Sequence, residues 1–118
     1  MIKVFSTGKN EYNCKLSTRY LISIEDKLGE NPINALKVND DEELPKLNPL
    51  LIILYYSMRS DKPTLKFEEI YDIYDEYCEN GGNIFKLYGF IFELLRDSGL
   101  IYSGNNEGDA EPEGEPKN

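Results

Sequence analysis

Residues 50–58, LLIILYYSM, form the most apolar stretch of the chain. Wound into a helix, this stretch is apolar on nearly every side, and a helix of that kind belongs at the centre of a bundle. It is too short to cross a bilayer, which needs about 20 residues. The pair Asn48-Pro49 precedes it, and Asn is a good helix cap while Pro suits the first helical position. The sequence therefore predicts a central helix from Leu50 to Arg59 and no membrane span.

The N-terminal segment has the alternating pattern of a β-hairpin. Apolar and polar residues alternate with a period of two on both sides of the turn-rich segment STGKN at 6–10. The apolar members of this alternation are Ile2, Val4, Tyr12, Cys14 and Leu16. Because an isolated hairpin is only marginally stable in water, we expect this one to lay one face on the helices.

Helical periodicity predicts further helices on both sides of the central one, and three of them follow a capping residue: Ser17 or Thr18, Asn31 and Asn83. The further helices cover Ser17 or Thr18 to Leu28, Ile33 to Leu36, a start between Thr64 and Phe67 to about Glu79, and Ile84 to Ser98. The short joint Asn80-Gly81-Gly82 favours an antiparallel pairing of the last two helices. The expected fold class is mainly α with a small N-terminal β-hairpin (α+β), arranged as a compact bundle of about four helices. The length of 118 residues fits one domain, which we place at residues 1–102.

The helix expected at 67–79 carries aromatic and acidic side chains on opposite faces. The core-facing stripe is predicted to contain Phe67, Ile70, Tyr71, Tyr74, Tyr77 and Cys78. The solvated face is predicted to contain Glu68, Asp72, Asp75, Glu76 and Glu79. The acids at 68, 72, 75 and 79 have no Lys or Arg within helical reach, and like charges at this spacing destabilise a helix by about 0.2–0.5 kcal/mol per pair. A basic partner could offset that repulsion.

The last helix has a wider apolar arc than a peripheral helix of a small bundle needs. Its polar positions form only a narrow stripe, at Lys86, Gly89, Glu93, Arg96 and Asp97. Either the helix is buried in the core, or part of its apolar arc contacts another chain. We therefore expect Phe85, Tyr88 and Phe92 to contribute to a partner-binding or self-association surface, which leaves a homo-oligomer open.

Two acidic segments contain little that could join a core. Residues 39–43, NDDEE, are expected to form an exposed loop. Residues 103–118, SGNNEGDAEPEGEPKN, contain no apolar residue larger than alanine and carry a net charge of about -4. A segment of this kind cannot bury enough apolar surface to offset the entropy lost on ordering. We therefore expect 103–118 to be a disordered acidic tail.

The formal net charge of -9 and the absence of histidine limit the chemistry of the chain. Without histidine it lacks the usual general base and the commonest metal ligand, and it has neither a glycine-rich phosphate loop nor a Cys/His metal spacing. We therefore expect no enzyme activity, no metal and no cofactor. The negative charge argues against binding of nucleic acid and favours a basic protein partner. Cys14 and Cys78 are expected to be free, partly buried thiols of a cytosolic protein, since the N-terminus lacks the apolar segment of a signal peptide.

Three short stretches resemble those of a known family. They are LSTR (16–19), the LG-x-NP segment (28–32) and DEYCENGG (75–82), which leads into an apolar helix. Together with the hairpin and the order of the helices, they make residues 10–101 similar to the tail assembly chaperones of long-tailed bacteriophages (siphoviruses) and related prophages of Gram-positive bacteria. These stretches are packing and capping features, and none is a catalytic signature.

The resemblance implies a small, mostly helical protein of the host bacterial cytoplasm that serves virion assembly and is absent from the mature virion. Such a chaperone binds the tape measure protein, keeps it soluble and promotes assembly of the tail tube protein around it. Members of the family are often made in two lengths through a programmed ribosomal frameshift. The acidic tail at 103–118 would suit such a junction.

A second interpretation belongs to a different functional class. The acids Glu68, Asp72, Asp75 and Glu79 would also suit an acidic inhibitor or nucleic-acid mimic that occupies a basic groove of a host protein. The two interpretations differ in salt dependence. Binding by a mimic should fall steeply as salt is added, whereas apolar chaperoning should persist.

Overall fold

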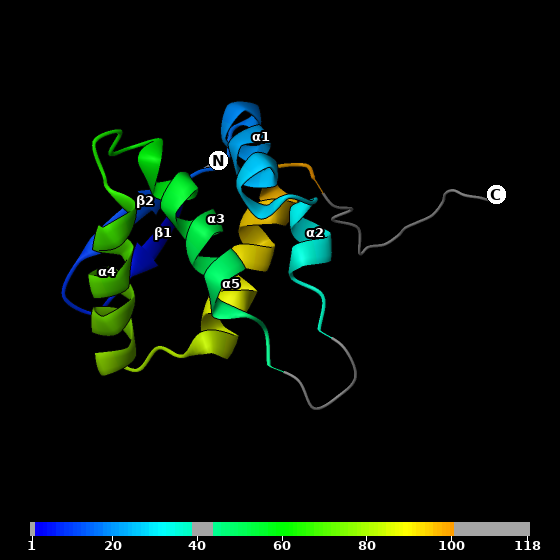
Figure 1. Ribbon diagram of the computed structural model, residues 1–118. Helices are drawn as coiled ribbons and strands as arrows, with labels where there is room; N and C mark the ends of the chain where they lie inside the picture. The colour runs from blue at the N-terminus through cyan, green and yellow to red at the C-terminus, as the bar shows by residue number, and fades with distance from the viewer. Residues whose placement is uncertain (1, 39–43, 101–118) are drawn as a thin grey trace.

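The structure, a computed structural model, describes residues 2–38 and 44–100 of the chain. The described part is mainly helical with a two-stranded antiparallel hairpin at its start, which confirms the expected fold class (Figure 1). Its elements are β1 (Lys3–Ser6), β2 (Glu11–Cys14), α1 (Thr18–Leu28), α2 (Pro32–Ala35), α3 (Leu47–Arg59), α4 (Phe67–Glu79) and α5 (Ile84–Asp97). The acidic loop predicted at 39–43 and the acidic tail predicted at 103–118 lie outside the described residues.

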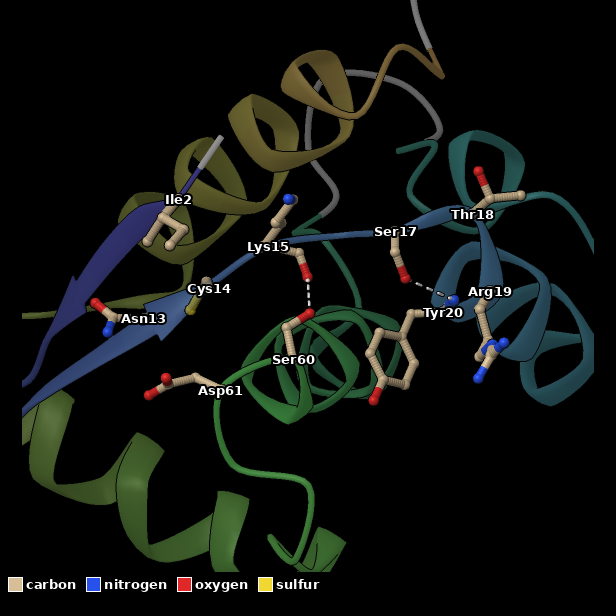
Figure 2. Close-up of a pocket in the computed structure, with 10 residues that line it drawn as sticks. All are labelled: Ile2, Asn13, Cys14, Lys15, Ser17, Thr18, Arg19, Tyr20, Ser60 and Asp61. Carbon is tan, nitrogen blue, oxygen red and sulfur yellow. Dashed lines mark hydrogen bonds between the residues drawn. The ribbon is translucent and has the colours of Figure 1, made fainter.

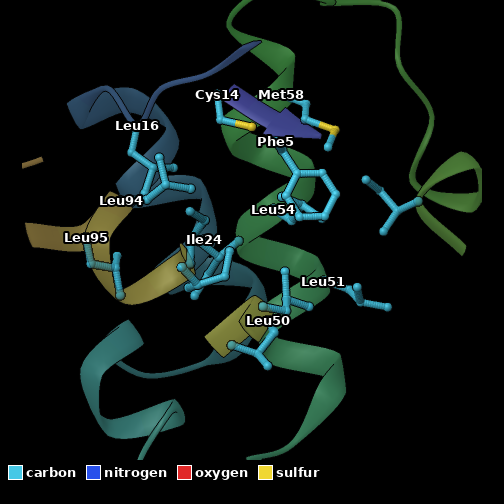
Figure 3. Packing of buried hydrophobic residues seen from close by; sticks show 14 of the residues in the cluster. Phe5, Cys14, Leu16, Ile24, Leu50, Leu51, Leu54, Met58, Leu94 and Leu95 are labelled. Carbon is cyan, nitrogen blue, oxygen red and sulfur yellow. The ribbon is translucent and has the colours of Figure 1, made fainter. Parts of the chain in front are cut away.

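Helix α3 lies at the centre of the fold, as its all-round apolar sequence predicted. It packs against α1, α4, α5 and strand β2, and Figure 1 shows it between α4 and α1. Leu50, Ile53 and Leu54 of α3 are completely shielded from solvent. Around them the core gathers side chains from both strands and from α1, α4 and α5 (Figure 3). One hydrophobic core therefore unites the described elements.

The start of α3 differs from the prediction. The helix begins at Leu47, and its capping residue Lys46 makes no side-chain cap hydrogen bond. Asn48 and Pro49 therefore lie inside the first turn rather than just before it. Proline is tolerated in the first turn because the N–H groups there have no acceptor within the helix. The cap-plus-proline signal was thus wrong about the first residue of the helix.

Three other helix starts lie where the capping residues predicted. Ser17 caps α1, Asn31 caps α2 and Asn83 caps α5, each by accepting a backbone N–H of the first turn. At its other end α1 stops at Gly29, which adopts the left-handed conformation at φ 75°. These local signals place the helices along the chain.

The hairpin packs on the helices through the predicted residues Cys14 and Leu16 on the side of β2, but through the face opposite to the predicted one in β1. Strands β1 and β2 pair with Phe5 opposite Tyr12. Phe5 and Cys14 are buried, whereas Ile2 and Val4 are exposed. Successive side chains of a strand point to opposite faces, so only one set in β1 can reach the core. The large ring of Phe5 belongs to the set that does.

The last two helices do not form the antiparallel pair that their short joint predicted. Both pack on α3 rather than along each other. Phe5 of the hairpin links them instead, with its ring centroid 4.6 Å from that of Tyr77 in α4 and 5.1 Å from that of Phe90 in α5. The chain leaves α4 through Gly81 at φ 100°, and the N–H of Gly82 donates to the Tyr77 carbonyl at 2.8 Å. This closing motif turns the chain away from α4.

Candidate protein-binding surfaces

The acidic face predicted on α4 lies at the surface. The four carboxylates singled out from the sequence are all exposed: Glu68, Asp72, Asp75 and Glu79. Within residues 2–38 and 44–100, the single ion pair joins Lys3 to Glu93 at 2.8 Å. None of the four carboxylates is therefore neutralised by a described Lys or Arg, and only solvent and salt screen their mutual repulsion.

Glu76 does not belong to the solvated face on which the sequence placed it. Its carboxylate accepts a hydrogen bond from the Thr7 hydroxyl and another, at 2.9 Å, from the side-chain amide of Asn10. These two hydrogen bonds hold the pKa of Glu76 below its ordinary value because they favour the charged form. Glu76 therefore fastens the hairpin turn to α4.

The core-facing stripe of α4 also differs from the prediction. Tyr71 and Cys78 were expected in the stripe, but both are exposed, Tyr71 by 54%. Ile73 was left out of the stripe, but it is buried. The hairpin turn binds α4 at Glu76. Because the hairpin packs against this part of the helix, the buried side of α4 includes Ile73 and excludes Tyr71.

Helix α5 turns one side to the core and leaves aromatic side chains in solvent on another. Its core side consists of Leu87, Ile91, Leu94 and Leu95. Phe85 is 59% exposed and Phe92 is 40% exposed. Tyr88 is half-buried, and its ring stacks beside that of Phe92 with centroids 6.2 Å apart. Gly89 is exposed and lies between the two Phe residues on the same side of the helix. We call Phe85, Tyr88, Gly89 and Phe92 the α5 outer face.

The acids of α4 and the aromatic side chains of α5 form two surfaces rather than one site. The two helices pack separately on α3, and the hairpin residue Phe5 contacts both of them. A partner that touches one set therefore need not touch the other.

The sequence did not identify a third surface, which lies between α1 and α4. It is a groove of about 360 Å³, lined by Lys27, Asn48, Ile52, Tyr55, Tyr56 and Phe67. We call these residues the aromatic groove. The adjacent tyrosines Tyr55 and Tyr56 interrupt the aliphatic run of α3, and they are the one signal that could have marked this side of the helix as less buried.

A larger open pocket of about 730 Å³ lies between the hairpin and the start of α1 (Figure 2). Two of its hydroxyl groups bind the backbone: Ser17 caps α1, and Ser60 donates to the Lys15 carbonyl at 3.0 Å. Burial raises the pKa of the Cys14 thiol to about 11. A thiol that stays protonated at neutral pH is a poor nucleophile, so the lining offers no activated cysteine.

Both cysteines are free, but their surroundings differ more than the sequence suggested. Cys14 is buried, whereas Cys78 is exposed on α4 rather than partly buried. Only the thiol of Cys78 is therefore open to reagents in the folded chain.

Residues 2–38 and 44–100 contain no group of three or more His, Cys, Asp or Glu side chains placed to hold a metal ion. Among the described helices, none has the length and apolar character needed to cross a membrane. Comparisons of the chain with protein-family models, with curated proteins and with solved structures find no match.

Proposed function

We propose that the chain is a tail assembly chaperone of a long-tailed phage or prophage. In the host cytoplasm it binds the tape measure protein, keeps it soluble and promotes assembly of the tail tube protein around it, without joining the mature virion. The proposal rests on the resemblance over residues 10–101 and on one structural observation. The α5 outer face holds Phe85 and Phe92 in solvent, although the opposite side of the helix fills the core. Exposed aromatic side chains gathered on one helix face are typical of protein-binding surfaces.

The α5 outer face has the spacing of a helix-binding surface. Phe85, Tyr88 and Phe92 follow one another at three and four residues, the spacing at which one helix presents anchors to another. Burying one such side chain stabilises a complex by about 1.5–3 kcal/mol before the costs of association are subtracted. A long helical client with apolar faces would gain from that burial, and the chain's net charge of -9 would help to keep the complex soluble.

The test is co-expression of the tagged chain with the tape measure protein, followed by capture on the tag. Substituting both Phe85→Ser and Phe92→Ser should abolish capture while leaving the melting temperature nearly unchanged, because both side chains are exposed. Ile22→Ser on α1 is the matched control, since Ile22 is 54% exposed and lies on another helix. Capture by the control should equal that of the unsubstituted chain.

Three results would each contradict a different part of this proposal. If the unsubstituted chain does not capture the tape measure protein, the function is wrong. If the double variant captures it as well as the unsubstituted chain does, the function stands but the α5 outer face is not the contact. If the double variant unfolds, Phe85 and Phe92 are core residues and the structural argument is lost.

An acidic inhibitor or nucleic-acid mimic is the second candidate function. The observation that favours it is the row Glu68, Asp72, Asp75 and Glu79, which is exposed and unpaired within the described residues. Repeating the capture at about 50 mM and about 500 mM salt separates the two functions. Loss of a partner at the higher salt favours the mimic, and retention favours the chaperone.

A further inference from the structure

A cleft of about 550 Å³ lies between the hairpin, the segment that joins α3 to α4, and α4 itself. We call it the hairpin–α4 cleft. Its apolar lining consists of Leu65 and Ile73, which are buried, and the half-buried ring of Tyr12. None of the described lining residues belongs to α5. The cleft therefore lies outside the surface on which the proposed function depends.

Three carboxylates line the hairpin–α4 cleft, those of Asp61, Glu69 and Asp72. In Figure 2 the side chain of Asp61 points to the side on which β2 and α4 lie. Glu69 uses one oxygen to accept a backbone N–H at the start of α4. Neither aspartate makes an ion pair with a Lys or Arg of residues 2–38 or 44–100. The cation among the described lining residues is Lys62, so the lining as a whole is negatively charged.

The ring of Tyr12 has a cation over its face. The Lys62 Nζ atom lies 5.5 Å from the ring centroid, a distance at which the negative face of an aromatic ring attracts an ammonium group. Lys62 is exposed, and within the described part of the chain it forms no ion pair. Burial raises the pKa of the Tyr12 hydroxyl, and the charges of Glu76 and Glu69 raise it further, because nearby anions disfavour another negative charge. The cleft thus favours cations at this ring.

We propose that the hairpin–α4 cleft binds an arginine side chain from a basic segment of a partner protein. The guanidinium stacks on the ring of Tyr12 in place of the Lys62 ammonium. Its N–H groups donate to the carboxylates of Asp61 and Asp72, and its methylene groups lie on Ile73. Arginine suits the cleft better than lysine because a planar guanidinium can stack on a ring and donate to carboxylates at the same time.

The backbone around the cleft is held in place before any partner binds. The N–H of Lys62 donates to the Met58 carbonyl at 2.9 Å, and the N–H of Leu65 donates to the Lys62 carbonyl at 3.0 Å. On the opposite wall Tyr12 pairs with Phe5 in the hairpin. A site whose backbone is already ordered loses little conformational entropy on binding. The cleft can therefore bind a single side chain, although weakly.

The probes are three short Gly/Ser peptides that differ at one central position. This position holds arginine, lysine or citrulline, which is an uncharged isostere of arginine. Each peptide is titrated into the isotope-labelled full chain at about 150 mM salt, which screens long-range attraction to the net charge. Amide shifts in NMR spectra report the affinity. The arginine peptide should bind about three- to tenfold more tightly than the citrulline peptide, and about twofold more tightly than the lysine peptide.

Variants of the chain should change the affinity for the arginine peptide in opposite directions. Asp72→Asn should weaken binding about two- to fivefold, whereas Asp75→Asn, on the same helix but outside the lining, should leave it unchanged. Lys62→Ala removes the competing cation from Tyr12 and should tighten binding about two- to fivefold. Lys37→Ala is its control, because Lys37 is exposed outside the cleft and its loss changes the net charge equally. Damage to the fold would not produce tighter binding.

The same spectra show where the arginine peptide binds. Amide shifts should change at Tyr12, Leu65 and Ile73 and stay constant along α5. Absence of shifts at millimolar peptide would overturn the inference, as would equal binding of the arginine and citrulline peptides or a lack of tightening by Lys62→Ala. Equal effects of the two aspartate substitutions would also overturn it, because the contact would then be the exposed acids of α4 and not the cleft. None of these results depends on the tape measure protein, so the proposed function and this inference can fail separately.

Discussion

Replacing Gly82 by alanine should destabilise the protein, whereas the same replacement at Gly89 should stabilise it. A Cβ atom added at Gly82 would lie 2.4 Å from two carbons of the Tyr77 ring, so one of the two residues must move. Tyr77 cannot swing away freely, because its ring packs against that of Phe5 at 4.6 Å. A Cβ atom added at Gly89 meets nothing within 4 Å, and Gly89 lies within helix α5.

The two substitutions should change the free energy of unfolding in opposite directions, by amounts large enough to measure. Overpacking of this kind costs about 1–3 kcal/mol. An alanine in place of a glycine within an exposed helix gains about 0.5–1 kcal/mol, because glycine loses more conformational freedom on folding. In a domain of this size each kcal/mol moves the melting temperature by about 4–8 °C. Gly82→Ala should therefore lower the melting temperature by about 4 °C or more, and Gly89→Ala should raise it by about 2–8 °C.

The assay is thermal unfolding followed by the circular dichroism of the helices, with urea unfolding as a second measure of the free energy. A Gly82→Ala variant as stable as the unsubstituted chain would show that Tyr77 does not pack over the joint, and the account of how α4 and α5 diverge would be wrong. A destabilised Gly89→Ala variant would show that the α5 outer face is covered by another part of the chain.

Two further predictions concern ionisable groups. The pKa of Glu76 is lower in the folded chain than its ordinary value of 4.5, so the stability it contributes is present above that value and is lost as pH falls through the lower folded pKa. Urea unfolding should therefore find Glu76→Gln less stable than the unsubstituted chain at neutral pH, with a difference that shrinks in acid; a constant difference would contradict the role of this carboxylate. Cys78 should react with a thiol reagent in the folded chain, whereas Cys14 should react only after unfolding, because it is buried with a pKa of about 11. Mass spectrometry of the alkylated protein would identify the modified cysteine, and rapid labelling of Cys14 would refute the burial.

Features that depend on a few neighbouring residues could be predicted from the sequence. Ser17, Asn31 and Asn83 were recognisable as caps because a capping side chain bonds to N–H groups two or three residues ahead. The position of α3 followed from its apolar run, since a helix without a polar side can only be central. Its first residue did not follow, because Pro49 is compatible with more than one place in the first turn.

Features that depend on distant neighbours could not be predicted in this way. The divergence of α4 and α5 depends on Phe5, which lies far from both in the sequence and contacts Tyr77 and Phe90. The rotation of the buried side of α4 toward Ile73 depends on the hairpin turn that binds Glu76. Periodicity reports which side of a helix is apolar, but it does not report which neighbour the helix meets.

The width of the apolar arc on α5 shows why the surfaces were only partly predictable. Helix α5 meets α3 on one side and Phe5 of the hairpin on another, and these contacts do not cover the whole arc. The uncovered part holds Phe85 and Phe92, and one residue between them, Gly89, has no side chain. The fold does not require a glycine at position 89, because the position is helical and open. A glycine there lets the backbone of another protein approach α5 closely. If the α5 outer face is the contact with a client helix, Gly89→Ala should weaken capture of the client while raising the melting temperature. Unchanged capture by the stabilised variant would show that the client helix does not approach α5 at Gly89.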